Sequence, residues 1–164
     1  MTEAGWEERV AEAWATFDER SDDENRILIE ALAAELPDGT AEASFERACV
    51  FDSTAAPELA VPLYRDALAR GLGPERRRRA VVQLASSLRN LGRADESVVL
   101  LTDELAAGSD ELDDAVRAFL ALALTDAGRC PEAVSHALTA LAPHLPRYQR
   151  SLAAYARNLG GETG

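Results

Sequence analysis

The 164-residue sequence contains no lysine, and all 17 of its basic residues are arginines. They stand against 29 acidic residues, which gives a net charge of −12 and a pI of about 4.6. Nucleic-acid binding needs a basic surface that neutralises phosphates, so this balance argues against a DNA or RNA partner. It argues equally against adsorption to anionic lipid. Any cationic contact of this chain uses the planar guanidinium group, which suits carboxylates.

Aromatic residues, cysteines and long apolar runs are also scarce. Aromatics make up 5% of the chain, whereas alanine and leucine are abundant, a bias that favours helices over strands. Two cysteines are too few for a disulfide-rich scaffold. No apolar run approaches the roughly 18 residues of a membrane span, and the N-terminal residues lack a signal-peptide pattern. These features predict an all-α, cytoplasmic protein with a single domain over residues 1–164.

Apolar residues recur at helical spacing along the chain, and proline and glycine fall between the periodic segments. Ser21 followed by Glu24 predicts a capping box. Proline in the first helical turn and glycine after the last are typical helix boundaries. We expect helix starts at Pro57, Pro74, Pro131 and Pro146, caps at Thr40 and at Ser109 or Asp110, and helix ends at Gly92 and Gly128.

Two segments of the chain resemble each other. "LRNLGRADES" and "LTDAGRCPEA" each carry a Gly-Arg pair, and the pairs begin 36 residues apart, at residues 92 and 128. When residues 41, 78 and 114 are aligned as first positions, small residues recur at the eighth and twentieth positions, where antiparallel helices would cross closely. These residues are Ala48, Ala85 and Ala121 at the eighth position, and Ala60, Ser97 and Ala133 at the twentieth.

This pattern resembles the tetratricopeptide repeat, a helix-turn-helix unit of about 34 residues. The resemblance implies a right-handed superhelical solenoid of antiparallel helix hairpins, with three repeats over residues 40–146. Residues 1–39 would form a degenerate capping helix pair, and residues 147–164 a capping helix and tail. The first repeat departs from the pattern with Ser53-Thr54 where a turn glycine is usual, and the middle repeat with Glu104 in place of alanine. The whole chain is also similar to small, stand-alone bacterial proteins of this family.

The resemblance implies non-catalytic binding of a protein or peptide in a concave groove. The family's groove positions place a polar stripe on the first helix of the middle repeat, where arginines can bind carboxylates and amides can bond a peptide backbone. Phe45 and Phe119 would flank this stripe as apolar anchors, and Tyr148 and Arg150 would close its far side. The stripe consists of Arg79, Gln83, Ser86, Arg89 and Asn90.

An alternative reading of the stripe is purely structural. In it, Arg79 and Arg89 pair with acids on neighbouring helices, because clefts and structural ion-pair networks look alike in a sequence. The candidate acids are Glu42, Glu46, Asp52 and Asp126. The residues of the family's chaperone-tail clamp are absent, since Phe45, Cys49, Gln83, Ala115 and Phe119 occupy those positions.

The basic run near residue 76 and the two tryptophans each have both a structural and a functional interpretation. The basic run "PERRRRA" from Pro74 to Ala80 is interpreted as a solvated helix end rather than a phosphate site. Trp6 and Trp14 share one helix face. They are expected to dock a capping helix on the solenoid, and the alternative is a self-association surface that would make the protein a homodimer or scaffold subunit.

Catalytic and metal-binding motifs are lacking. Cys130 and His136 lie near each other, but no zinc-type ligand spacing exists. No glycine-flanked nucleophile and no glycine-rich phosphate loop occurs. We therefore expect a protein that is not an enzyme and uses no cofactor and no metal.

Overall fold

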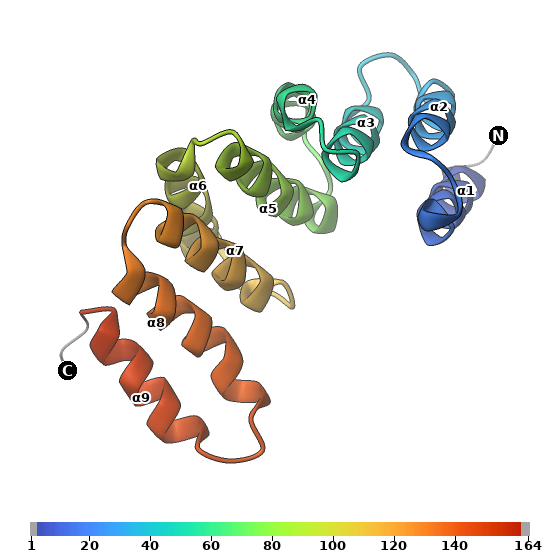
Figure 1. Cartoon of the computed structure of the whole chain (residues 1–164). Helices are drawn as coiled ribbons and strands as arrows, with labels where there is room; N and C mark the ends of the chain where they lie inside the picture. The colour runs from blue at the N-terminus through green and yellow to red at the C-terminus, as the bar shows by residue number, and fades with distance from the viewer. Residues whose placement is uncertain (1–2, 162–164) are drawn as a thin grey trace. The chain divides into compact units, whose positions relative to one another are not determined.

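The computed structural model describes residues 3–161, with side chains from Gly5 onward, and within this range the chain forms helices and turns without any strand (Figure 1). This confirms the all-α expectation. Two short 3₁₀ segments, Phe17–Glu19 and Ala142–His144, follow the first and eighth helices. The helices are α1 (Glu3–Ala15), α2 (Asp22–Ala33), α3 (Ala41–Ser53), α4 (Pro57–Arg70), α5 (Pro74–Asn90), α6 (Ala94–Ala107), α7 (Asp113–Asp126), α8 (Cys130–Leu141) and α9 (Gln149–Leu159).

The chain divides into two compact units, and the boundary falls inside α5, between Ala80 and Val81. In the first unit, α2 packs on α1 and on α3, and α3 forms a hairpin with α4. In the second unit, α7 packs on α6 and α8, and α8 packs on α9. The single domain and its division into caps and three repeats stay predictions.

The two Gly-Arg pairs end their helices in the same way. In each, the glycine adopts the left-handed conformation, with φ of 73° and 75°. The N–H of the following arginine donates to the carbonyl of the leucine five residues earlier, at 2.9 and 2.8 Å. Each arginine also donates two hydrogen bonds to the glutamate three residues later. The repetition is therefore a helix-ending turn, made by Leu88, Gly92, Arg93 and Glu96 and again by Leu124, Gly128, Arg129 and Glu132.

The first repeat makes this turn without glycine. The N–H of Ala56 donates to the carbonyl of Phe51 at 2.8 Å, and Ala55 adopts the left-handed conformation with φ of 56°. The turn residue is thus Ala55, one place beyond the Ser53-Thr54 pair that the sequence pattern pointed to. A side chain in this conformation is strained, because Cβ approaches the backbone.

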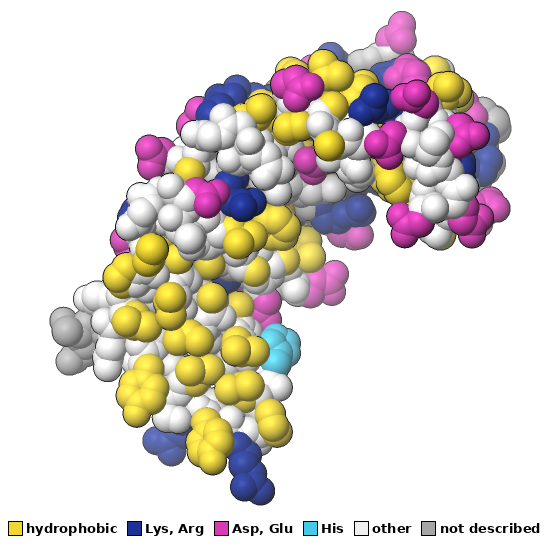
Figure 2. All heavy atoms as spheres, viewed as in Figure 1, with side chains coloured by type: hydrophobic (Ala, Val, Ile, Leu, Met, Phe, Trp, Pro, Cys, Tyr) yellow, Lys and Arg dark blue, Asp and Glu magenta, His cyan; other side chains and the backbone are white. Residues whose placement is uncertain are grey.

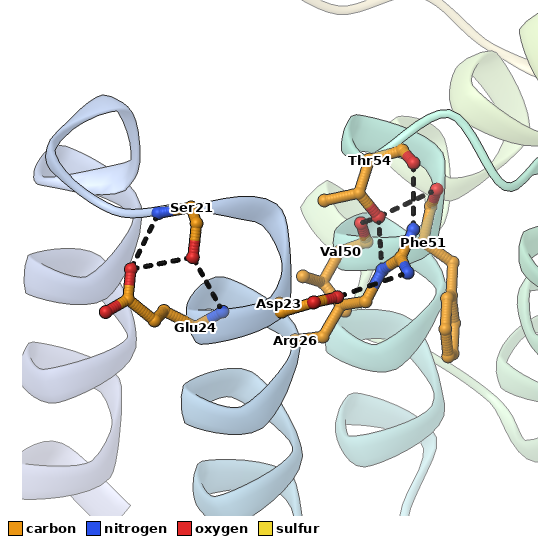
Figure 3. Close-up of polar contacts among 7 residues, drawn as sticks. All are labelled: Ser21, Asp23, Glu24, Arg26, Val50, Phe51 and Thr54. Carbon is orange, nitrogen blue, oxygen red and sulfur yellow. Dashed lines mark hydrogen bonds and ion pairs between the residues drawn. The ribbon is translucent and has the colours of Figure 1, made fainter.

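Helix α2 begins and packs through defined polar contacts (Figure 3). Ser21 and Glu24 form the predicted capping box, in which each side chain bonds the other's backbone N–H. Arg26 donates from Nε to the hydroxyl of Thr54 at 2.8 Å and from Nη2 to its carbonyl at 2.9 Å. Its guanidinium lies 5.8 Å from the centre of the Phe51 ring. Arg26 thereby supplies hydrogen bonds at the C-terminal end of α3 and holds α2 against it.

Three other predicted helix starts differ in the structure. Thr40 precedes α3, but its hydroxyl bonds the carbonyl of Pro37 instead of capping the helix. Helix α7 begins at Asp113, because residues 110–112 form a turn held by side-chain bonds of Ser109 and Asp110. Helix α9 begins at Gln149 rather than at Pro146. Local polar bonds of short side chains compete with the helix at such positions.

Each unit has its own core. The first contains a cluster around Trp6, Val10, Ile29 and Leu32, and the second a cluster around Leu101, Val116, Leu120 and Leu124. All six small residues at the eighth and twentieth repeat positions are buried, as expected for close helix crossings. They are Ala48, Ala60, Ala85, Ser97, Ala121 and Ala133.

Candidate functional site

A pocket of about 620 Å³ lies in the first unit, between α1, α3 and the start of α5. Residues from all three helices line it because each helix presents residues three or four apart on one face. We call it the Trp14 pocket. Its apolar wall is Val10, Ala11 and Trp14, and its charged lining is Glu7, Glu42, Glu46, Glu75, Arg76 and Arg79, with Gly73 and Pro74 at the turn into α5.

Glu46 is the deepest charged group of the Trp14 pocket, with 4% of its surface exposed. Its Oε2 accepts a hydrogen bond from the indole Nε1 of Trp14 at 2.8 Å. The Trp14 ring stacks on Phe17, with 5.2 Å between the ring centres. Burial raises the pKa of Glu46, and this effect outweighs the opposing effects of the Trp14 hydrogen bond and of Arg76 and Arg79.

Arg76 joins the three helices of the pocket. Its Nη2 pairs with the carboxylate of Glu7, and its Nε lies 3.8 Å from Oε1 of Glu46. The hydrogen bond to Glu7 raises the pKa of Arg76. The guanidinium also lies 5.9 Å from the centre of the Trp6 ring. Arg76 is therefore a structural cation, occupied by two acids of its own chain.

For Arg76 and Arg78, this arrangement departs from the interpretation of "PERRRRA" as a solvated helix end. Arg76 is half-buried and Arg78 is buried, whereas Arg77 and Arg79 are exposed. Four successive helical residues point in four directions. The four arginines therefore lie in different surroundings. Those that face the core need acidic or polar partners.

Arg79 stands apart from the other charges at the pocket. It is exposed, and its guanidinium lies 5.5 Å from the centre of the Phe45 ring. Within residues 3–161 it forms no ion pair, so the structural alternative, in which Arg79 pairs with an acid, does not describe it. The ring beneath it keeps the cation at the mouth of the pocket.

Phe45 does not have the role expected from the sequence. It is fully buried, and its ring lies 6.2 Å from that of Tyr64. It cannot serve as an exposed apolar anchor and instead supports Arg79 from within the core.

In the second unit the stripe on α5 is partly neutralised. Nε of Arg89 lies 2.6 Å from Oδ2 of Asp126 on α7, so for this arginine the structural alternative is correct. Gln83 and Ser86 are half-buried, and Asn90 is exposed. The polar character of the stripe is present, but one of its two cations is paired.

The remaining predicted groove residues also lie in the second unit. Phe119 of α7 is half-buried and packs against the core cluster of that unit. Tyr148 and Arg150 are exposed at the beginning of α9, where both line a second pocket. Tyr148 and Arg150 therefore lie on a surface that is accessible in this unit.

The two tryptophans of α1 face their own fold. Trp6 is 3% exposed and donates its indole N–H to the carbonyl of Leu32 at 2.8 Å. Trp14 is half-buried and lines the pocket. Trp6 thus offers no surface to a second copy, which removes the main support for self-association through this helix.

Glu7 of the pocket had no predicted role as a site residue. Arg76 was considered only as part of the basic run "PERRRRA", and Glu46 as a groove position of the family and a possible partner of the stripe. The sequence held one sign of this pocket, namely Glu42 and Glu46 four residues apart on α3 and the arginines at the start of α5. Spacing within one helix, however, does not show which helices contact each other.

Other kinds of site find little support in this structure. Across residues 3–161, no three or more His, Cys, Asp or Glu side chains gather in a way that could hold a metal ion. None of the helices in the described range combines the length and the apolar character that crossing a membrane requires.

Comparison with known proteins agrees with the helical architecture. No curated protein matches the sequence. Among solved structures, the chain is similar to that of YrrB, described as a TPR protein with an unusual peptide-binding site, with a TM-score of 0.55 and 14% identity over 94% of this chain and 86% of that chain. The model of the tetratrico peptide repeat family matches residues 41–159. Since this match covers well over half of the sequence, the chain belongs to the tetratricopeptide repeat family.

Proposed function

We propose that this protein is a non-catalytic binding module that holds a peptide segment of another protein, with the Trp14 pocket as its principal site. The tetratricopeptide repeat is in general a protein-interaction fold, which supports the class of function. A peptide-binding site is also the feature named for YrrB, whose fold this chain shares.

The observation that carries the proposal is the state of Arg79. It is exposed at the pocket, lies over the Phe45 ring and forms no ion pair within the described residues. An unpaired guanidinium at the mouth of a pocket can take a carboxylate through two parallel hydrogen bonds. The neighbouring Arg76 is already paired with Glu7 and Glu46, so Arg79 is the cation available to a ligand.

The pocket walls define the rest of the ligand. Val10, Ala11 and the ring of Trp14 form an apolar wall that suits one apolar side chain. The ligand is therefore a segment with an acidic side chain, or a chain-terminal carboxylate, close to an apolar residue. Gln83, Ser86 and Asn90 belong to the second unit, and their proposed role in bonding a peptide backbone is separate from the Trp14 pocket.

A library of displayed random peptides, selected against the immobilised full chain, tests this proposal. We expect the selected peptides to combine a carboxylate with a nearby apolar residue. Substitution of Arg79 by glutamate should weaken their binding by roughly tenfold or more, because a charge-assisted pair becomes a repulsion.

Arg77 offers a matched control, since it is exposed and lies two residues away on another side of α5. Arg77→Glu changes the net charge by the same amount and should leave the affinity within about twofold. Equal loss in both variants would contradict the proposed role of Arg79, as would selected peptides without acidic groups.

A further inference from the structure

The C-terminal part of the chain has a charge opposite to that of the rest. Residues 133–161 contain three arginines and no aspartate or glutamate, in a sequence whose net charge is −12. The three arginines, Arg147, Arg150 and Arg157, are exposed. None of them forms an ion pair with any residue in the range 3–161. A local cationic surface therefore exists on an acidic protein.

The same three arginines line one pocket of about 800 Å³ on α9. Arg150 and Arg157 are seven residues apart and lie on one side of α9, and Arg147 lies two residues before the helix begins. Ala153 and Ala154 also line it. The result is a cationic surface that includes small residues and is open to another chain.

Exposed apolar side chains accompany this surface. Tyr148, at the start of α9, is 77% exposed and also lines the pocket. Figure 2 shows hydrophobic side chains gathering over α8 and α9. Val134 and Leu141 of α8 and Tyr155 and Leu159 of α9 are the large exposed ones. Of these residues, Tyr148 lies at the arginine pocket, whereas Tyr155 and Leu159 project from other sides of α9. An exposed aromatic ring beside unpaired charges is typical of an interaction surface.

We infer that α9 docks an acidic segment of another protein, with carboxylates at intervals of about one helical turn that meet Arg147, Arg150 and Arg157. Bidentate arginine–carboxylate pairs give the orientation, and Tyr148 covers the apolar part of the segment. Attraction is local, since charges farther than about 8 Å are screened at physiological salt. This site is separate from the Trp14 pocket and does not depend on the function proposed for it.

Fluorescence anisotropy with the full chain tests the inference. The probe is a labelled synthetic peptide with glutamates at every third or fourth position among alanines and one leucine. A matched peptide carries lysine in place of each glutamate. We expect the glutamate peptide to bind and the lysine peptide not to bind. The double substitution R147E/R150E should weaken binding of the glutamate peptide by roughly tenfold or more.

The chain offers a control with the same change in charge. Arg93 and Arg129 lie in the same unit outside the pocket, each paired with a glutamate three residues later. The variant R93E/R129E should bind the peptide within about twofold of the unchanged chain. The loss in R147E/R150E should be the same when both chains also carry Arg79→Glu, which removes any binding of the probe at the Trp14 pocket and separates the two sites. Circular dichroism establishes that all variants keep their helices.

Several outcomes would overturn the inference. Equal loss in R147E/R150E and R93E/R129E would show a response to net charge alone. Binding of the lysine peptide would rule out charge complementarity. Self-association in sedimentation runs that R147E/R150E abolishes would identify a second copy as the occupant. Binding to phosphatidylserine vesicles, lost in the same variant, with no binding of the glutamate peptide, would identify a membrane surface instead.

Discussion

At the scale of single residues, the pocket of the first unit depends on one buried carboxylate. Glu46 is nearly inaccessible, yet it accepts a bond from Trp14 and lies beside Arg76, so its charge is compensated by donors from two other helices. Removal of one partner from such a group leaves a buried polar atom unsatisfied, which costs about 1–3 kcal/mol. Arg79 is the opposite case, a cation without an acidic partner among the described residues.

The raised pKa of Glu46 predicts a specific dependence of stability on pH. Because the folded-state pKa lies above that of the unfolded chain, folding favours the protonated form, and Glu46 destabilises the fold progressively as the pH rises from the ordinary glutamate range through the raised pKa. Glu46→Gln removes this titration and keeps an acceptor for Trp14. The difference in unfolding free energy, unchanged chain minus variant, should therefore fall as the pH rises. Urea denaturation at a series of pH values measures it.

Other carboxylates provide the contrast for this measurement. Hydrogen bonds from Arg9 lower the pKa of Glu35, and those from Arg70 and Ser44 lower that of Asp66. Their stabilising contribution is present above the unfolded-state pKa and is lost as the pH falls through the folded-state pKa, the reverse of Glu46. A difference curve that rises with pH would contradict the assignment for Glu46.

At the scale of elements, the helix-ending turns explain why the chain repeats itself. Gly92 and Gly128 occupy a left-handed position, and the following arginines close the turn through the backbone and pair with a glutamate. The first repeat makes the same turn with Ala55. The first repeat therefore has the turn of the other two repeats although its sequence lacks their glycine.

Ala55→Gly should stabilise the protein by about 0.5–1 kcal/mol. Glycine relieves a left-handed strain of about 1–2 kcal/mol, and the greater freedom of the unfolded chain offsets part of this gain. Chemical denaturation measures the shift. The reciprocal change Gly92→Ala should cost about 1 kcal/mol through the backbone alone, because a Cβ at Gly92 would meet no atom within 4 Å. An unchanged or lower stability of Ala55→Gly would show that the turn relaxes around alanine.

At the scale of the whole molecule, charge is the dominant property. The chain carries a net charge of −12 at neutral pH, and its arginines are divided between local acid pairs and a few accessible positions. Repulsion between copies at this charge keeps a protein in solution and opposes non-specific contacts with other acidic molecules. Specific contacts must then come from local cationic positions such as Arg79 and the arginines of α9.

Solubility should therefore be lowest near the pI of about 4.6. Protonation of the carboxylates removes the net charge there, and the exposed apolar residues of α8 and α9 then meet without repulsion. Light scattering of the protein across a pH series should show a maximum near this value. Tyr155→Ser should reduce that maximum, whereas constant scattering from pH 7 to 4 would contradict the account.

Much of the local structure could be predicted from the sequence. The spacing of apolar residues, the Ser21–Glu24 capping box and the glycine turns depend on neighbours within a few residues, and the structure confirms them. Thr40 and Asp110 were less predictable, because short polar side chains can bond either a helix end or a nearby turn.

The candidate site could be predicted only in part. The resemblance to the family placed Arg79 and Arg89 in one stripe, yet Asp126 pairs with Arg89 and no described acid forms an ion pair with Arg79. Phe45 occupies a groove position in the family pattern but is buried.

The sequence by itself therefore determined the helices, the two turns at Gly92 and Gly128 and the family, since these follow from interactions within a turn or a repeat. Only the tertiary structure decided which arginine is paired, which aromatic is buried and that Glu7, Glu46 and Arg76 meet at one pocket. These outcomes depend on contacts between helices that are distant in the chain. There, a difference of a few ångströms between an arginine and a carboxylate decides whether the two form an ion pair.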